Sequence, residues 1–217
     1  MKAAIVALTP DGAAVAARLR LFLDADVWLK NSALSGVVDS GIANEVRTFD
    51  HLIDIAEAVF NDHEAIVFVM AMGIVFRVLA PYVKSKYTDP AVVVVDEAAR
   101  VAISALSGHE RGANDLALRV ATALEAEPVV TTASESRRRS YVGIGCRKGA
   151  PVANVLTAIA EALTKADSTP ADVRYLATVE DKAGEPAIIE AARVLDIPLP
   201  IFSKSRINAA NLRFGGS

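Results

Sequence analysis

The chain has 217 residues, of which 53% are hydrophobic, and a formal net charge of −3. A chain of this length and composition can bury a sizeable core in one large domain or two small ones. Its apolar runs are far shorter than the roughly 20 residues that cross a bilayer, so we expect no membrane span. Acidic and basic residues are interspersed without a basic block, which argues against nucleic acid as a partner.

The N-terminus and the cysteine content predict a cytoplasmic protein. The opening stretch "MKAAIVALTPDG" has one Lys, a short apolar run and then Pro-Asp-Gly, which indicates a first strand and turn rather than a secretory signal. Cys146 is the only cysteine, so no internal disulfide can form, and this suits a reducing compartment.

Apolar, β-branched runs alternate along the chain with segments of helical spacing, which predicts an α/β fold of mostly parallel sheets covered by helices. The expected strands are Lys2–Leu8, Asp26–Leu29, Ala65–Met70, Val92–Asp96, Val101–Ser104, Pro128–Thr131, Tyr141–Gly145, Val173–Val179 and Pro198–Phe202. The expected helices are Ala14–Leu23, His51–Phe60, Ile74–Val83, Asn114–Leu124, Val152–Leu163 and Pro186–Leu195. Thr9-Pro10 and Gly149–Pro151 also indicate helix starts with Pro in the first turn. A hairpin that turns at Asp96–Ala99 explains the run Val101–Ser104 equally well.

The polar stretch "SESRRRS", residues 134–140, has no apolar member and reads as a linker. It would join two α/β domains, residues 1–133 and residues 141–217. No internal repeat and no low-complexity tract stands out in the chain.

Small and polar residues gather in the loops that follow the predicted strands. In an open parallel sheet such loops meet at the carboxyl edge, where ligands bind, and several of these loops precede helices whose free N–H groups favour anions. Two arginines, one inside an apolar helix and one in a glycine loop, could pair with an anionic ligand. The candidate binding residues from this reasoning are Thr9, Gly12, Gly73, Arg77, Ser107, Gly108, Thr131, Thr132, Gly143, Gly145 and Arg147.

Three residues are candidates for acid–base work. His109 can exchange a proton at cytoplasmic pH and follows Gly108, but a surface histidine bonded to a carbonyl is the plainer alternative. Asp96 and Glu97 end a predicted strand, where carboxylates are either catalytic or cap the turn. We interpret His51 and His63 as structural. No spacing of His, Cys or acidic residues matches a zinc site, so no protein-held metal is expected.

The stretch "VGIGCRKGAP" raises a nucleotide-binding alternative, because a GxG follows a predicted strand and precedes a helix. Its third glycine comes one residue late for the GxGxxG pattern. A tight strand-to-helix turn that needs small residues explains it better.

Several motifs in order resemble the CbiG family of anaerobic cobalamin biosynthesis, the cobalt-precorrin-5A hydrolases. They are "ALTPDGAAVAARL", "MAMGIVFRVLAP", "KYTDPAVVVVDE", "ALSGHERGAN", "PVVTTAS" and "VGIGCRKG". Residues 141–202 resemble the start of the family's C-terminal domain, which also occurs alone as the CobE protein. The family's usual middle segment is replaced here by residues 134–140, and its C-terminal domain is expected to be shortened.

The resemblance implies hydrolysis of the δ-lactone of cobalt-precorrin-5A, with loss of acetaldehyde to give cobalt-precorrin-5B. Water would attack the lactone, with His109, Asp96 or Glu97 as the general base. It also implies binding roles for Asn114, Lys182 and Glu185. Cobalt would arrive with the substrate, so no cofactor is expected. A homodimer or a complex with other enzymes of the pathway is the expected assembly, and a non-catalytic tetrapyrrole carrier is the alternative function.

Overall fold

The computed structural model describes residues 2–38, 40–43, 45–133 and 138–208. The chain divides into two compact units, Met1–Val130 and Thr131–Ser217, which we describe separately. Residues 134–137 of the stretch predicted to be a linker lie outside the described residues, and Ser140 opens a strand. Within the described residues, no helix has both the length and the apolar character needed to cross a membrane.

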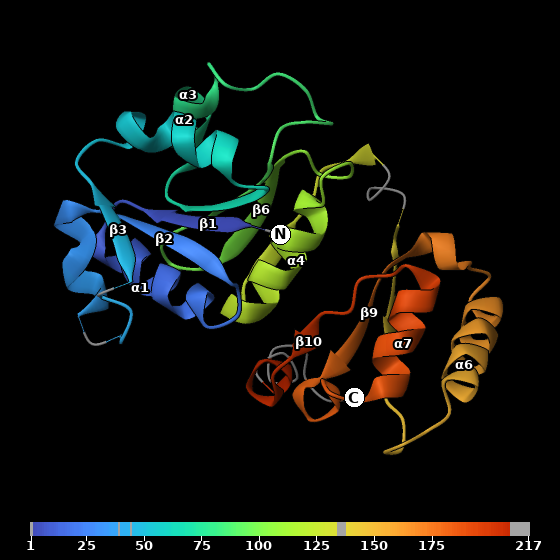
Figure 1. The fold of residues 1–217 in the computed structure, drawn as a ribbon. Helices are drawn as coiled ribbons and strands as arrows, with labels where there is room; N and C mark the ends of the chain where they lie inside the picture. Colours follow the sequence, from blue (N-terminus) through green and yellow to red (C-terminus); the bar gives the residue numbers. More distant parts are fainter. Residues whose placement is uncertain (1, 39, 44, 134–137, 209–217) are drawn as a thin grey trace. The chain divides into compact units, whose positions relative to one another are not determined.

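The first unit is built on a seven-stranded sheet of order β3-β2-β1-β4-β5-β6-β7 (Figure 1). Its strands are β1 (Ala3–Ala7), β2 (Ala25–Lys30), β3 (Val46–Phe49), β4 (Ala65–Val69), β5 (Ala91–Val95), β6 (Val101–Leu106) and β7 (Glu127–Val129). The first five strands run parallel to one another. β6 then pairs antiparallel with β5, and β7 runs parallel to β6.

Helices cover both faces of this sheet (Figure 1). On one face α1 (Pro10–Arg20) and α4 (Ala113–Leu124) pack with alternate strand residues such as Ile5 and Val67. On the other face α2 (Leu52–Asp62) and α3 (Met72–Leu79) pack with the intervening residues such as Val6 and Phe68. Because both faces are covered, β1, β4 and β5 are buried along their whole length, as their unbroken apolar runs predict.

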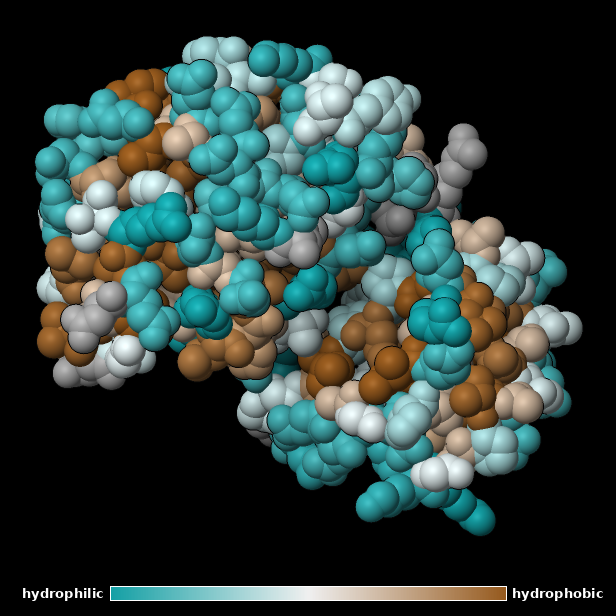
Figure 2. Space-filling model, in the orientation of Figure 1, coloured by the Kyte–Doolittle hydropathy of each residue, from teal (hydrophilic) through white to brown (hydrophobic). Residues whose placement is uncertain are grey.

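The second unit holds a three-stranded parallel sheet of order β10-β9-β8. Its strands are β8 (Ser140–Gly143), β9 (Val173–Val179) and β10 (Ile201–Phe202). Its helices α6 (Val152–Lys165) and α7 (Pro186–Leu195) share one apolar cluster with residues of β9. Figure 2 shows hydrophobic residues among hydrophilic ones on the visible surface of both units.

The predicted fold class, mostly parallel α/β, is confirmed. The expected strands and helices occur with shifted ends. α1 begins at Pro10, four residues before Ala14, because Thr9 caps it and Pro10 occupies its first turn, so the helix start indicated by Thr9-Pro10 is confirmed. The alternative of a hairpin after Asp96 is right. Two elements were not predicted from the sequence. They are β3, whose Arg47 and Thr48 are exposed, and the 3₁₀ helix η1 (Asn31–Val37).

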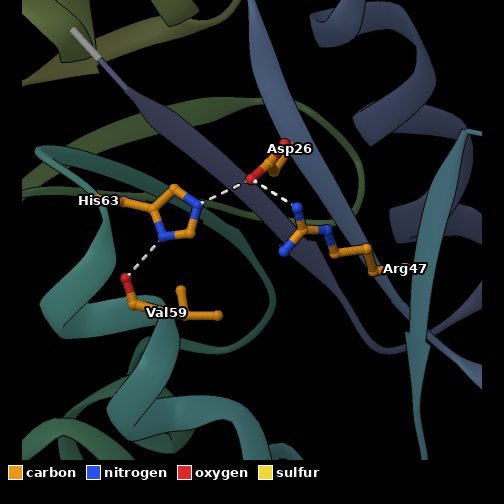
Figure 3. Close-up of polar contacts among 4 residues, drawn as sticks. All are labelled: Asp26, Arg47, Val59 and His63. Carbon is orange, nitrogen blue, oxygen red and sulfur yellow. Dashed lines mark hydrogen bonds and ion pairs between the residues drawn. The ribbon is translucent and has the colours of Figure 1, made fainter.

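His63 joins three elements of the first unit in a network of polar contacts (Figure 3). Its Nδ1 lies 3.0 Å from the Val59 carbonyl oxygen at the end of α2, and its Nε2 lies 3.2 Å from Asp26 Oδ2 in β2. Arg47 of β3 contacts the same carboxylate oxygen at 3.4 Å. The ring is buried, and all of these contacts are to structural elements, which agrees with the structural interpretation of His63.

Gly36 is the glycine on which the packing of η1 against α1 depends. A Cβ at this position would overlap the Pro10 carbonyl oxygen and come within 2.9 Å of Pro10 Cα. We expect Gly36→Ala to lower the free energy of unfolding by about 1–3 kcal/mol, measured by urea unfolding, because backbone must move to admit the methyl group. Gly184→Ala is the control, since nothing lies within 4 Å of its Cβ position. Equal effects of the two substitutions would contradict the packing argument.

Candidate functional site

The strand order of the first unit reverses between β1 and β4. The chain runs from β1 outward through β2 and β3, then returns to place β4 on the other side of β1. α1 follows β1 on one face, and α3 follows β4 on the other. We call the carboxyl ends of β1 to β5 the switch edge. Open α/β sheets bind their ligands at such a reversal point.

Thr9 links two of the loops that meet at the switch edge. Its hydroxyl accepts a hydrogen bond from Gly12 N at 3.1 Å, which caps α1, and donates one to Glu97 Oε1 at 2.7 Å. Glu97 itself is exposed. A Cβ at Gly12 would lie 3.2 Å from both Thr9 Oγ1 and the Val69 carbonyl oxygen, so glycine lets α1 begin close against the end of β4. The loops after β1 and β5 are therefore tied together across β4.

The start of α3 offers backbone donors at the same edge. Its N-cap, Ala71, has no side-chain hydrogen bond to the helix, and the helical bonding begins with Ile74 N to the Ala71 carbonyl oxygen at 3.0 Å. The N–H groups of Met72 and Gly73 precede that first bond, as expected for a helix start. Arg77 is exposed one turn further along, and its Nη1 donates to the Gly73 carbonyl oxygen at 3.0 Å.

Asp96 caps the turn between β5 and β6. Its Oδ1 accepts from Arg100 N at 2.7 Å and from Val101 N at 2.9 Å, and its Oδ2 accepts from Arg100 Nε at 2.7 Å. Partial burial raises the pKa of the Asp96 carboxyl, but the hydrogen bonds from the Arg100 side chain and the two backbone N–H groups outweigh it, so the net pKa is lowered. Both oxygens are engaged in the turn, which makes Asp96 a poor acceptor for a substrate proton.

The loop that carries His109 lies at the opposite edge of the sheet. Because β6 is antiparallel to β5, its last residue, Leu106, pairs with Val92 near the start of β5. Residues Ser107 to Asn114 are thus separated from Asp96 by the length of β5, on the order of 17 Å for five residues. The expectation of one cleft lined by all the strand-end loops is wrong for this reason. We call the edge at which β6 and β7 end the far edge.

The far edge has its own polar arrangement. Ser107 has a left-handed backbone with φ 57°, and its buried hydroxyl has no hydrogen-bond partner among the described residues. Asn114 is buried at the start of α4, where Ser104 Oγ donates to its Oδ1 at 2.8 Å and its N–H donates to the Gly108 carbonyl oxygen at 3.0 Å. His109 is exposed. Thr131 and Thr132 come directly after β7 in the chain and belong to the second unit.

Glu110, next to His109, forms an ion pair with Lys86. The hydrogen bond from the Lys86 ammonium is the main cause that lowers the pKa of the Glu110 carboxyl. This pair ties the loop after β6 to the loop before β5.

Five further predicted residues of the second unit lie at or after the carboxyl ends of β8 and β9 in the small sheet. Gly143 ends β8 and Gly145 and Arg147 follow it, all three exposed, while Lys182 and Glu185 follow β9. Glu185 is buried and its Oε1 accepts from Gly149 N at 2.9 Å, so it holds the glycine loop against the start of α7. This contact explains the loop as a braced strand-to-helix turn.

Two polar residues at the switch edge were absent from the predicted set. Asn31 follows β2, Asp50 follows β3, and Asn31 Nδ2 donates to Asp50 Oδ1 at 2.7 Å. Asp50 was missed because β3 was not predicted. Among the described residues, no group of three or more His, Cys, Asp and Glu side chains is placed to hold a metal ion.

Family models cover most of the chain. The model described as "Cobalamin synthesis G N-terminal" matches residues 54–135, and "Cobalamin synthesis G C-terminus" matches residues 140–216. Two proteins named "Cobalt-precorrin-5A hydrolase" are similar to it. The one from Priestia megaterium is 38% identical over 136 residues, which is 62% of this chain and 36% of that protein. The one from Salmonella typhimurium is 40% identical over 140 residues, 63% of this chain and 37% of that protein.

A third relative matches a shorter stretch. "Protein CobE" from Sinorhizobium sp is 31% identical over 68 residues, which is 31% of this chain and 44% of that protein. The matches span less than half the length of each of the three relatives.

The lowered pKa of Asp96 predicts a pH-dependent contribution to stability. A carboxyl whose pKa is lower in the folded chain than its ordinary 3.8 stabilises the fold above that value, and this contribution disappears as pH falls through the folded pKa. Asp96→Asn should therefore lower the urea midpoint at about pH 7, and the difference from the unaltered protein should shrink below about pH 4. Glu97→Gln is the control, because Glu97 is the exposed neighbouring carboxylate and does not cap this turn, so its substitution should not reproduce the effect. A gap that stays constant with pH would contradict a charged turn cap.

Proposed function

Because the chain belongs to the cobalamin synthesis G (CbiG) family, we propose that it is a cobalt-precorrin-5A hydrolase. Its two similar relatives of that name support this activity. The reaction adds water across the δ-lactone and leaves a carboxylate and an alcohol. Proton loss from that alcohol then breaks the neighbouring carbon–carbon bond, which releases acetaldehyde, and the ring carbon takes up a proton to give cobalt-precorrin-5B.

The hydrogen bond from Thr9 to Glu97 is the observation on which our choice of base rests. It holds Glu97 Oε1 at 2.7 Å from Thr9 Oγ1, at the point where the strand order reverses. We propose that the second carboxylate oxygen takes a proton from the attacking water. A well-placed general base contributes about 10²–10⁴-fold in rate. Asp96 is not proposed for this role, because both of its oxygens cap the turn.

Backbone donors support the same edge as the place of the chemistry. The first N–H groups of α3, at Met72 and Gly73, would stabilise the oxyanion that forms when water adds to the lactone carbonyl. The substrate also carries many acetate and propionate carboxylates. The exposed Arg77 guanidinium and the start of α1 would attract them.

We propose that cobalt enters with the macrocycle and that the protein needs no further cofactor. We propose a cytoplasmic location, supported by the single cysteine, Cys146, which suits a reducing compartment. We propose the small-molecule tetrapyrrole as the binding partner. The expected assembly is a homodimer or a complex with other enzymes of the pathway.

A carrier of the tetrapyrrole without turnover is the second candidate function. The observation that favours it is that Asp96, one of the three predicted bases, has both carboxylate oxygens engaged in the turn between β5 and β6. Binding of cobalt-precorrin-5A without acetaldehyde release would establish it.

The two candidate bases can be separated because they lie at opposite edges of the sheet. We expect Glu97→Gln to lower kcat by about 10²-fold or more and His109→Gln to change it by less than about threefold. Acetaldehyde release from cobalt-precorrin-5A, coupled to alcohol dehydrogenase, measures both. If His109→Gln lowers kcat strongly and Glu97→Gln does not, the lactone is hydrolysed at the far edge. If neither substitution lowers kcat, neither Glu97 nor His109 is the general base.

Thr9 provides a test of how Glu97 is held. Thr9→Val removes the hydrogen bond to Glu97 and the cap of α1, and we expect kcat to fall about tenfold and stability by about 1 kcal/mol. Thr9→Ser keeps the hydroxyl and should restore both. If Thr9→Val loses stability while kcat is unchanged, Thr9 serves only as a helix cap.

A further inference from the structure

Three aromatic side chains form a row across the sheet of the second unit. Tyr141 of β8 pairs in register with Tyr175 of β9, and their ring centroids are 4.8 Å apart. Phe202 of β10 continues the row, with its centroid 6.4 Å from that of Tyr175. All three strands of the sheet thus contribute one ring. We call these residues the aromatic row.

The aromatic row lies on the face of the sheet opposite to helices α6 and α7. Side chains alternate between the faces of a strand, and the neighbours Val142 and Leu176 pack in the cluster that holds the buried residues of both helices. Tyr141 and Tyr175 therefore point to the other face. Tyr141 is 56% exposed, and Tyr175 and Phe202 are only partly buried. An aromatic face of this kind on a small sheet indicates a binding surface.

Two arginines accompany the rings. Arg174 Nη1 donates to the Tyr141 hydroxyl oxygen at 3.2 Å. The Arg206 guanidinium lies 5.3 Å above the centroid of the Phe202 ring, in cation–π contact. The surface thus combines apolar ring faces with the positive charge of Arg174 at the Tyr141 end, while Arg206 contacts the ring at the Phe202 end. Its chemical complement is a flat, conjugated ring that bears carboxylates.

The tilts of the rings also suit such a ligand. The ring planes of Tyr141 and Tyr175 are inclined by 60°, and those of Tyr175 and Phe202 by 37°. If Tyr175 stacks face-on against a flat ligand, Tyr141 is inclined to that ligand by 60°, close to edge-on, and Phe202 by 37°. Aromatic contacts favour both the stacked and the edge-to-face arrangement.

We propose that the aromatic row is a subsite for the macrocycle, with Tyr141, Tyr175 and Phe202 against its flat face and Arg174 toward one of its carboxylates. This proposal rests on the proposed function, because it takes the tetrapyrrole substrate as the ligand. It differs from the lactone-opening chemistry assigned to the first unit, since the rings supply binding and no proton transfer.

The test is the dissociation constant of cobalt-precorrin-5A, followed by its visible absorbance in a titration of the full chain. We expect Tyr141→Leu and Tyr175→Leu each to raise Kd about tenfold, a loss typical of one aromatic contact. Tyr87→Leu is the matched control, because Tyr87 is an exposed tyrosine of the first unit, 66% accessible, outside the aromatic row. Thermal unfolding of every variant checks that folding is intact, and Tyr141→Leu is the mildest change because its ring is the most exposed of the three.

The charge component has its own readout. Arg174→Gln should raise Kd and weaken the dependence of Kd on salt concentration, because one cation no longer faces a carboxylate. A purely structural role for Arg174 would leave that salt dependence unchanged.

The outcomes distinguish this subsite from the proposed function. If the unaltered protein releases acetaldehyde and both tyrosine variants bind as tightly as it does, the subsite is wrong and the hydrolase stands. If the variants leave Kd unchanged but alter the sedimentation of the protein, the aromatic row is a contact between copies of the chain, and the subsite is again wrong. If the unaltered protein does not bind cobalt-precorrin-5A, the substrate itself is wrong, and the subsite with it.

Discussion

The antiparallel pairing of β5 with β6 determines which loops of the first unit can act on one ligand. Val95 pairs with Ala102 at the turn, and Val92 pairs with Leu106 at the other end. The chain that leaves β6 therefore emerges beside the start of β5. Had β6 continued the parallel order, His109 and Glu97 would have met at one edge. The reversal instead gives the sheet two polar edges, and the chemistry must be assigned to one of them.

The switch edge has the arrangement that ligand binding in an open α/β sheet requires. α1 and α3 begin there on opposite faces, so their first N–H groups approach the same region from two sides. Thr9 serves both the fold and the site, because one hydroxyl caps α1 and also holds Glu97. The far edge carries a different kind of feature, the buried hydroxyl of Ser107, which has no hydrogen-bond partner in the described part of the chain and stands on a left-handed backbone. Such strain costs free energy and persists only where the surrounding structure enforces it.

The fold class and most elements could be predicted from the sequence, because buried parallel strands such as β4 and β5 are unbroken runs of apolar residues. β3 could not, since only Phe49 is buried and the other side chains are polar or partly exposed. The reversal after β5 could be predicted only as one of two equal alternatives, because its turn leaves little trace in residue types. The turn places Ala99 at φ 53°, where Gly or Asn is usual. Asp96 stabilises the turn through three hydrogen bonds, which no local sequence pattern predicts.

From the sequence, the site residues could be predicted only one loop at a time, without knowing which loops lie together. The sequence indicates that Thr9, Gly73 and Glu97 follow strands, but the strand order decides that they share an edge. The aromatic row was missed for a related reason. Tyr141, Tyr175 and Phe202 are far apart in the sequence, and each alone is an ordinary strand aromatic, so only the pairing of β8, β9 and β10 makes them one surface. The two kinds of surface differ in what they can offer a ligand. A sheet edge presents backbone N–H groups and charged side chains from its loops, whereas a row of ring faces can stand only on the face of a sheet.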